Sequence, residues 1–363
     1  MSQATKRHKE VNIRDVANRA LVSVGTVSRS LNNRPGVELD LRERVLKAAK
    51  ELNYQLPKRV EPAAHNTSRQ THWFNPNEAI TEISHVAFCC RPIISPLRSG
   101  EQDPYFPLML RGVEAECSQY GLHLIYRIIE DEGRALEQGR KMLLESHADA
   151  LLLINFVDRK LVGGLTDMGL PMVLVDHLFP DLPLDTVSND NYSGGISAVR
   201  HLIKKGHRRI GFLNGLPHIT VQQRFEGYRR ALEEAGIPFD SAHVLPGDLT
   251  LDGGLAAAQT VIERGLDCTA YFCSNDWSAF GFIKGLRARG LRVPDDISII
   301  GFDDAETSKL ISPTLTTVRA DPVGVGRMAV RKLIERVKFP NLSITQTLLY
   351  TELIERQSVR NLK

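Results

Sequence analysis

Two hydrophobic patterns divide this chain. Up to about residue 54, apolar side chains recur at intervals of three and four, whereas from His85 onward short apolar runs alternate with segments of helical spacing. The first pattern is typical of amphipathic helices, and the second of strands that alternate with helices. The sequence therefore predicts a small helical region followed by a larger α/β region.

The small region predicts three short helices. Asn12 is a candidate N-cap for the first, and Ser23 for a second that begins near Val24. A turn-rich segment at 32–36 separates the second helix from the third. Each helix has one apolar stripe, formed by Ile13, Val16, Ala17 and Ala20, by Val27 and Leu31, and by Leu41, Val45, Ala48 and Leu52.

The larger region predicts seven strands, at 86–89, 122–126, 150–156, 172–175, 210–213, 270–273 and 297–300. Between the first two, apolar residues from Phe106 to Tyr120 have helical spacing and stop at Gly121, a typical helix C-cap. This alternation predicts parallel sheets with helices on both faces. Because so many strands exceed one comfortable sheet, we expect two smaller sheets that face a cleft.

Composition narrows the class of protein. With 42% hydrophobic and 25% charged residues, the chain is unlike disordered, collagen-like or disulfide-scaffold proteins. Its apolar runs are far shorter than the ~20 residues that cross a bilayer, and its charged N-terminus predicts a cytoplasmic protein. The five cysteines have no disulfide or metal-ligand spacing, so we expect reduced and mostly buried thiols.

Charge is unevenly distributed along the chain. Residues 1–60 contain 13 Lys or Arg and 6 Asp or Glu, whereas acidic residues exceed basic ones by four in the remainder. A basic N-terminal region favours DNA, because neutralised phosphates release condensed counterions. The alternative is a basic surface that is merely solvated.

The outer face of the second predicted helix fits a DNA major groove, which is about 12 Å wide. The segments IRDVA (13–17), VSVGTVSRSLN (22–32) and LNY (52–54) resemble the headpiece of the lac repressor family of bacterial transcription regulators. The resemblance implies that bases are read by Val24, Gly25 and Arg29, and that phosphates are contacted by Ser23, Thr26, Ser28 and Asn32. The chemistry agrees, since Arg29 can make a bidentate pair with guanine.

Two features depart from that family. Leu21 stands at a turn position where the family has glycine, so either the turn relaxes or a left-handed leucine costs ~1 kcal/mol. Pro62 interrupts a hinge helix that the family commonly has after the head, so we expect no helix through 59–64. Trp73 and Phe74 are the only Phe, Trp or Tyr residues of the hydrophilic linker, and we expect weak coupling between head and body unless these two anchor it to the body.

Polar and aromatic side chains follow several predicted strands. The carboxyl ends of parallel strands are where open α/β sheets bind ligands. The candidates there are Tyr105, Phe106, Asp176, Thr220, Arg224, Asn275 and Asp303. Forked hydrogen bonding beside aromatic rings suits a neutral polyol or a purine, although an acidic side chain after a strand often only caps a helix.

The resemblance extends through the larger region. The segments KGHRRI (205–210), RFEGY (224–228), SND (274–276), GFDD (301–304) and LTTV (315–318) are similar to the same family's effector domain, which is itself like periplasmic sugar-binding proteins. The resemblance implies that Phe106, Asp176, Thr220, Arg224, Asn275 and Asp303 contact the effector, and that the protein is a homodimer. Leu249 and Ala320 depart from the family pattern, so the effector's identity does not transfer.

Other classes have weaker support. The segment GVGRMA (324–329) matches a dinucleotide motif but does not follow a strong strand, and His201 and His207 do not share a helix face for a metal ion. We therefore predict no enzyme, metal or cofactor. A cytoplasmic or secreted solute-binding protein without operator function remains the alternative, against which the basic head argues.

The sequence as a whole predicts a DNA-binding transcription regulator, a repressor by resemblance, whose affinity for operator DNA is controlled by a sugar or sugar derivative. We expect a helix-turn-helix domain at 1–58, a linker at 59–84 and an effector and dimerisation domain at 85–363. The last divides into subdomains at 85–188 plus 320–338 and at 189–319 plus 339–357.

Overall fold

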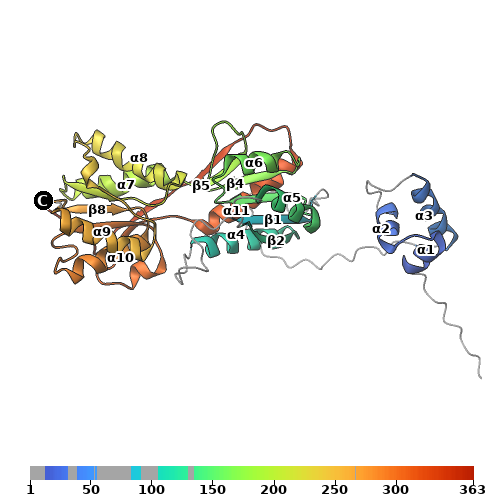
Figure 1. Cartoon of the computed structure of the whole chain (residues 1–363), viewed down its shortest axis with the longest axis horizontal. Helices are drawn as coiled ribbons and strands as arrows, with labels where there is room; N and C mark the ends of the chain where they lie inside the picture. The colour runs from blue at the N-terminus through green and yellow to red at the C-terminus, as the bar shows by residue number, and fades with distance from the viewer. Residues whose placement is uncertain are drawn as a thin grey trace, which may run out of the picture. The chain divides into compact units, whose positions relative to one another are not determined.

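The computed structural model describes residues 13–31, 39–52, 54, 83–90, 105–129, 135–265 and 267–363. The chain divides into two compact units, residues 1–73 and 74–363 (Figure 1). Several predicted features lie outside the described residues: the Asn12 cap, the turn at 32–36, and the linker up to residue 82 with Trp73 and Phe74.

The first unit contains the three predicted helices. They are α1 (Ile13–Ala20), α2 (Val24–Leu31) and α3 (Leu39–Glu51). Their apolar stripes meet in one core, which contains Val16, Ala17, Ala20, Val27, Val45, Ala48 and Ala49. Polar contacts reinforce this packing: Arg44 donates to the Ala20 carbonyl at 2.8 Å, and Arg19 pairs with Glu51 at 2.7 Å.

The turn between α1 and α2 keeps its tight geometry. Ser23 caps α2 as predicted, since its Oγ accepts from the Thr26 amide at 3.1 Å. Leu21 adopts a left-handed backbone with φ of 56°, so of the two outcomes open from the sequence the turn does not relax. Its side chain is 83% exposed and adds little packing to offset the strain.

We expect Leu21→Gly to stabilise the head by about 0.5–1 kcal/mol. Glycine removes a left-handed strain of roughly 1–2 kcal/mol but adds some freedom to the unfolded chain. Hydrogen exchange of the α1–α3 amides in the full chain measures the change. Leu21→Ala is the matched control, because it removes the same exposed side chain and keeps Cβ; equal stabilisation by both variants would contradict the strain argument.

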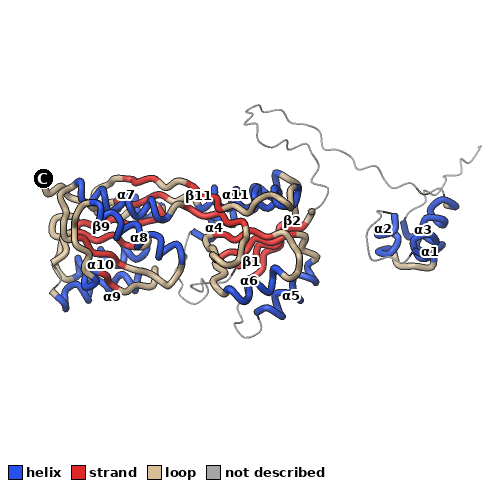
Figure 2. Tube along the Cα trace, turned by 90° about the horizontal axis from the view of Figure 1, so that it is seen from above, coloured by secondary structure: helices blue, strands red, loops and turns tan. Residues whose placement is uncertain are grey.

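The second unit contains two six-stranded sheets, each with helices on both faces (Figures 1 and 2). The first sheet has the order β11-β5-β4-β3-β1-β2, and all of its pairs are parallel. Its strands are β1 (His85–Cys90), β2 (His123–Ile128), β3 (Ala150–Ile154), β4 (Met172–Val175), β5 (Asp185–Asn189) and β11 (Gln346–Leu349). Its helices are α4 (Tyr105–Gln119), α5 (Ala135–Ser146), α6 (Arg159–Thr166) and α11 (Pro322–Lys338).

The second sheet has the order β12-β10-β9-β8-β6-β7. Its strands are β6 (Ile210–Leu213), β7 (Val244–Leu245), β8 (Ala270–Cys273), β9 (Ser298–Asp303), β10 (Thr316–Arg319) and β12 (Glu352–Ile354). Its helices are α7 (Asn191–Lys204), α8 (Ile219–Glu234), α9 (Leu251–Arg264) and α10 (Asp276–Ala288), with short 3-10 turns at Ser241–His243 and Glu306–Lys309. Only β12 breaks the predicted parallel arrangement within the described strands, because it pairs antiparallel with β10.

The α/β architecture with two sheets confirms the predicted fold class, but the assignment of 339–357 to the second subdomain was wrong in part. β11 hydrogen-bonds to β5 in the first sheet, and only β12 belongs to the second. The chain thus crosses between the sheets three times, after β5, after β10 and after β11.

The first crossing is hydrogen-bonded to each of the other two. The Asn189 side-chain oxygen accepts from the Asp321 amide at 3.0 Å, which joins the first crossing to the second. The Asp190 amide donates to the Leu349 carbonyl at 2.8 Å, which joins the first to the third. We therefore expect a rotation of one sheet against the other to change the hydrogen bonds that residues 189 and 190 make to the other two crossings.

Two further observations bear on the class of protein. All five cysteines are free and buried, as expected for structural thiols. None of the helices in the described part of the chain is long and apolar enough to cross a membrane.

Candidate functional site

Four of the seven predicted ligand residues form one polar cluster in the second unit: Tyr105, Asp176, Arg224 and Asp303. The Tyr105 hydroxyl donates to Asp176 at 2.9 Å, and Arg224 lies 3.6 Å from Asp303. Burial raises the pKa of Tyr105 well above its usual value, and the Asp176 and Asp303 carboxylates raise it further. Tyr105 and Asp176 belong to elements around the first sheet, α4 and the end of β4. Arg224 and Asp303 belong to elements around the second sheet, α8 and β9.

Asp176 is held rigidly at the end of β4. It is 5% exposed and adopts a φ of 55°, a backbone region that is strained for a side chain of this kind. Ser188 donates to it at 2.8 Å, and the Asn189 backbone also donates. Burial nevertheless raises the pKa of Asp176 above its ordinary value.

Arg224 is equally fixed. It projects from α8, and its guanidinium donates to Asn191 at 2.9 Å and to the Ser274 carbonyl at 2.5 Å. The same group stacks 3.8 Å above the Phe302 ring. These contacts orient the planar guanidinium beside Asp303, where it can share hydroxyl groups of a ligand with that carboxylate.

Two histidines that the sequence analysis did not single out lie beside the cluster. His177 follows Asp176, and His218 caps α8, where its Nδ1 lies 2.8 Å from the Thr220 hydroxyl. The two rings, one from each sheet's side, lie 5.5 Å apart between centroids. The sequence signal that could have identified them is their position beside two predicted site residues, Asp176 and Thr220.

Both imidazoles are neutral at physiological pH. Burial, together with the smaller effects of nearby His177 and Arg224, lowers the pKa of His218 from its usual 6.5 to about 4. Burial also lowers the pKa of His177. A neutral imidazole presents one donor and one acceptor, which suits hydroxyl groups better than anions.

We expect His218 to make the fold sensitive to mild acid. Its pKa is lower in the folded chain than in the unfolded chain, so the unfolded chain takes up a proton first as the pH falls below 6.5. Between pH 6.5 and 5 this removes about 2 kcal/mol of stability, and the loss ends below pH 4. Urea unfolding across this range measures it. His218→Asn keeps a cap acceptor but does not titrate, so an unchanged pH slope in that variant would contradict the prediction.

Of the three remaining predicted residues, Thr220 lies buried beside His218, and the other two have structural roles of their own. Phe106 packs in an aromatic group, with its ring 5.6 Å from Phe88 and 6.2 Å from Tyr126. Asn275 is the N-cap of α10: it accepts from the Ser278 amide at 3.0 Å and donates to the Leu249 carbonyl at 2.9 Å. The structure therefore uses Asn275 as a helix cap, the role that the sequence analysis weighed only for acidic residues after strands.

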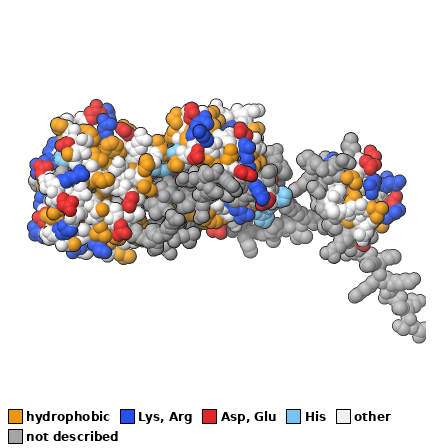
Figure 3. Space-filling model, viewed as in Figure 1, with side chains coloured by type: hydrophobic (Ala, Val, Ile, Leu, Met, Phe, Trp, Pro, Cys, Tyr) orange, Lys and Arg blue, Asp and Glu red, His pale blue; other side chains and the backbone are white. Residues whose placement is uncertain are grey.

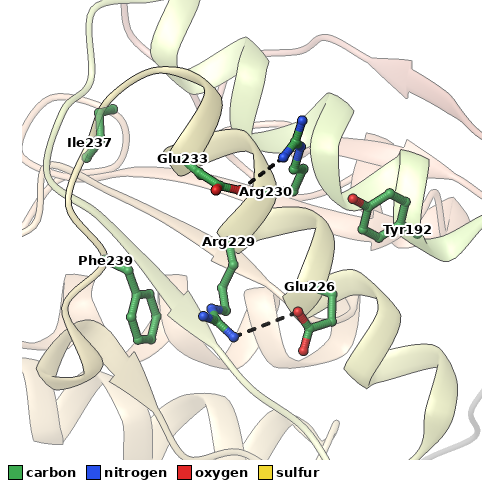
Figure 4. Close-up of a pocket in the computed structure, with 7 residues that line it drawn as sticks. All are labelled: Tyr192, Glu226, Arg229, Arg230, Glu233, Ile237 and Phe239. Carbon is green, nitrogen blue, oxygen red and sulfur yellow. Dashed lines mark hydrogen bonds and ion pairs between the residues drawn. The ribbon is translucent and has the colours of Figure 1, made fainter.

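A surface pocket of about 420 Å³ lies elsewhere, on the outer side of α8 (Figure 4). It is lined by Tyr192, Glu226, Arg229, Arg230, Glu233, Ile237 and Phe239, none of which was predicted to bind ligand. Its charges already face one another, since Arg229 pairs with Glu226 at 3.8 Å and Arg230 with Glu233 at 3.1 Å. We therefore place the candidate ligand site at the cluster.

The candidate DNA-reading residues lie at the start of α2. Ser23, Val24, Gly25, Thr26, Ser28 and Arg29 occupy the cap and the first turns of this helix, whereas Asn32 lies outside the described residues. The side chains of Val24, Ser28 and Arg29 are also outside them, but Ser23 and Thr26 are described, with their hydroxyls 2.9 Å apart. Exposed basic side chains of this unit include Arg19, Arg44, Lys47 and Lys50 (Figure 3).

Comparisons with known protein families agree with both units. The family model "Bacterial regulatory proteins, lacI family" matches residues 12–56, and a "Periplasmic binding protein-like domain" model matches residues 199–359. The ribose operon repressor of Haemophilus influenzae is 30% identical over 352 residues, which is 97% of this chain and 99% of that protein.

Solved structures show the same architecture. The regulator CelR in complex with cellobiose is 29% identical, with a TM-score of 0.70 over 96% of this chain and 99% of that one. The lac repressor dimer bound to operator and an anti-inducer is 24% identical, with a TM-score of 0.70 over 97% of this chain and all of that one. At that lower identity the second comparison shows a shared fold.

Proposed function

The chain belongs to the lacI family of bacterial regulatory proteins, and from that premise we propose which ligand it senses and which residues bind it. It is a DNA-binding transcription repressor whose operator affinity is controlled by a small ligand, and it is not an enzyme. The proposed ligand is a sugar or sugar derivative, bound at the cluster of Tyr105, Asp176, Arg224 and Asp303.

The observation that carries this proposal is the arrangement of Asp176 and Arg224. One buried carboxylate follows β4 of the first sheet, one buried guanidinium projects from α8 beside the second sheet, and each is fixed by its own hydrogen bonds. Beside them stand the neutral imidazoles of His177 and His218. Such a set binds a neutral molecule with several hydroxyl groups, since it offers forked donors and acceptors with little net charge. The relatives named for ribose and cellobiose bind or control the use of compounds in this class.

Phe106, Thr220 and Asn275 complete the proposed ligand set. Thr220 is 9% exposed beside His218, so its hydroxyl can turn from that ring to a ligand. Phe106 offers an aromatic surface from the first turn of α4. The Asn275 side chain already bonds to the Leu249 carbonyl and the Ser278 amide, so it can contact a ligand only while it keeps these bonds. We therefore expect Asn275 to contribute least to ligand affinity.

The proposed division of labour follows the two units. Residues 1–58 bind operator DNA, with Val24, Gly25 and Arg29 on bases and Ser23, Thr26, Ser28 and Asn32 on phosphates. Residues 59–84 link this domain to residues 85–363, which bind ligand and hold a homodimer together. We propose that the protein acts in the cytoplasm, where operator DNA is found.

The alternative is a solute-binding protein without operator function. The second unit alone fits that role, since it matches a periplasmic binding protein-like model. The specific observation against it is the first unit, whose three helices match the lacI model over residues 12–56.

Two measurements test the proposed function. A thermal-shift panel of ribose, cellobiose, other sugars and nucleosides should contain at least one stabilising compound, because a ligand at 100 times its dissociation constant adds about 2.7 kcal/mol. Selection from random double-stranded DNA should yield a two-fold symmetric site, as a dimer requires. Binding of a sugar without any DNA selection would favour the solute-binding alternative, and no stabilisation by any sugar would contradict the ligand class.

A further inference from the structure

Asn189 lies where the ligand cluster meets the chain crossings. It is the last residue of β5, is 1% exposed, and is followed directly by the first crossing between the sheets. Its side chain was not among the predicted site residues. Both ends of its amide are used, and they bond to two different parts of the second unit.

The donor end of this amide faces the ligand cluster. Asn189 Nδ2 donates to the Tyr105 hydroxyl at 2.8 Å, and that hydroxyl donates onward to Asp176 at 2.9 Å. A tyrosine hydroxyl has one proton, so donation to Asp176 requires an acceptor role toward Asn189. The three groups therefore form one chain of hydrogen bonds with a fixed direction, in which each bond polarises the next.

The acceptor end faces the second crossing. Asn189 Oδ1 accepts from the Asp321 amide at 3.0 Å, and Asp321 is the N-cap of α11. Tyr105 is the first residue of α4, which packs against α11 over the face of the first sheet. One buried amide thus connects the starts of two packed helices with the ligand-binding carboxylate.

Neighbouring residues extend the connection to the second sheet. Asn191 donates to the Asn189 carbonyl at 2.9 Å and accepts from Arg224 at 2.9 Å. The Asn189 backbone itself donates to Asp176. Residues 189–191 therefore touch Asp176 on one side and Arg224 on the other, while they form the first crossing.

We propose that Asn189 is the positioning residue that couples ligand binding to the relative orientation of the two sheets. The inference rests on the proposed function, because it assumes a ligand at Asp176 and Arg224. A ligand that competes for the Tyr105 hydroxyl or for Asp176 changes the hydroxyl oxygen that accepts from Asn189 Nδ2. The Oδ1 of the same side chain holds the second crossing at Asp321. Asn189 acts through Tyr105 and Asp321, without contact to the ligand.

The discriminating variant is Asn189→Asp. An ionised aspartate has the same shape and still accepts from the Asp321 amide, but it cannot donate to Tyr105. The matched control is Asn214→Asp, at the end of β6, where the side-chain oxygen accepts from the Gly215 amide at 2.9 Å. Both substitutions replace an amide by a carboxylate at the carboxyl end of a strand.

The first readout needs no ligand. Hydrogen exchange of the full chain should show faster exchange in the first turn of α4 in Asn189→Asp, where the bond to Tyr105 is lost, and no such change in Asn214→Asp. Unchanged exchange at α4 would overturn the proposed link. This measurement keeps its meaning even if no sugar binds, so failure of the proposed function is recognised separately from failure of the coupling.

The second readout measures coupling. Operator affinity is determined with and without saturating ribose, or cellobiose if that compound gives the larger thermal shift. We expect the ligand-induced change to fall about tenfold in Asn189→Asp, within the usual range of coupling energies, while ligand affinity without DNA stays within about threefold. Tyr105→Phe and the double variant complete a cycle, in which non-additive effects support action through Tyr105. A full ligand response in Asn189→Asp, or strictly additive effects, would overturn the proposal.

Discussion

Replacing Arg224 by alanine is expected to weaken ligand binding by at least about 100-fold and to abolish the ligand-dependent change in operator affinity. The guanidinium is oriented by hydrogen bonds to Asn191 and Ser274 and lies beside Asp303. A ligand that accepts from this guanidinium loses its hydrogen-bond donor in the variant. Isothermal titration with the compound found in the thermal-shift panel measures the loss. Retention of ligand affinity would move the site away from the cluster.

Loss of the Arg224 side chain also leaves buried acceptors without their donor, which costs roughly 1–3 kcal/mol for each group. A loss of binding through unfolding must therefore be separated from a loss of contact. Arg224→Lys keeps the charge and the apolar stem but not the planar fork, so it should retain more stability and still lose most of the affinity.

The matched control for both variants is Arg229→Ala, on the same helix. That side chain is half exposed, lies in the pocket of Figure 4, and pairs with Glu226 at 3.8 Å. We expect ligand affinity in this variant to equal that of the unaltered chain. A larger loss in Arg229→Ala than in Arg224→Ala would place the ligand in the surface pocket.

The head could be predicted almost completely from the sequence. Its helices are short and amphipathic, so the spacing of Val16, Val27 and Val45 alone places each helix against the common core. The conformation of Leu21 could not be decided in that way. Whether a leucine bears left-handed strain depends on how well the neighbouring helices hold the turn, which is a property of the packed unit.

The larger unit was predictable where its strands are apolar. The central strands β3, β4 and β6 contain no polar side chain, because they are covered on both faces. The strands β5, β10, β11 and β12 were missed, since they contain polar residues such as Asp185 and Thr317 that are satisfied by partners distant in sequence. The strand β7 was missed because it is only two residues long. Missing β11 led directly to the wrong assignment of the segment after residue 339.

The same cause limited the prediction of the site. Asp176 and Asp303 follow recognisable strands, so the rule of strand ends found them, and Arg224 follows on the next helix. Asn189 lies on β5, which has no apolar signal, and its role depends on partners at Tyr105 and Asp321 that only the fold brings close. Asn275 shows the opposite limit, because a helix cap and a ligand contact have the same sequence pattern.

Replacing Arg29 by alanine is expected to cost ~1–3 kcal/mol on the selected operator, which is about 5-fold to 150-fold in affinity. Arg29 lies on α2, in the helix whose start is fixed by the Ser23 cap and by the core at Val27. From that helix a guanidinium can pair with O6 and N7 of one guanine, and no smaller side chain can make both bonds. The variant should therefore lose base preference at one position of each half-site.

Lys6→Ala is the contrasting variant, because a lysine that contacts only phosphate contributes equally to every DNA sequence. We expect it to reduce the slope of log affinity against log salt by about one and to leave base preference unchanged. Arg29→Lys should lose base preference to the same extent as Arg29→Ala but recover part of the DNA affinity. Lysine keeps the positive charge but cannot make the paired hydrogen bonds of the guanidinium. Selection from randomised half-sites at two salt concentrations separates these effects. If Arg29→Ala weakened specific and random DNA equally, Arg29 would be a phosphate contact, and sequence recognition would have to come from Val24, Gly25 and their neighbours on α2.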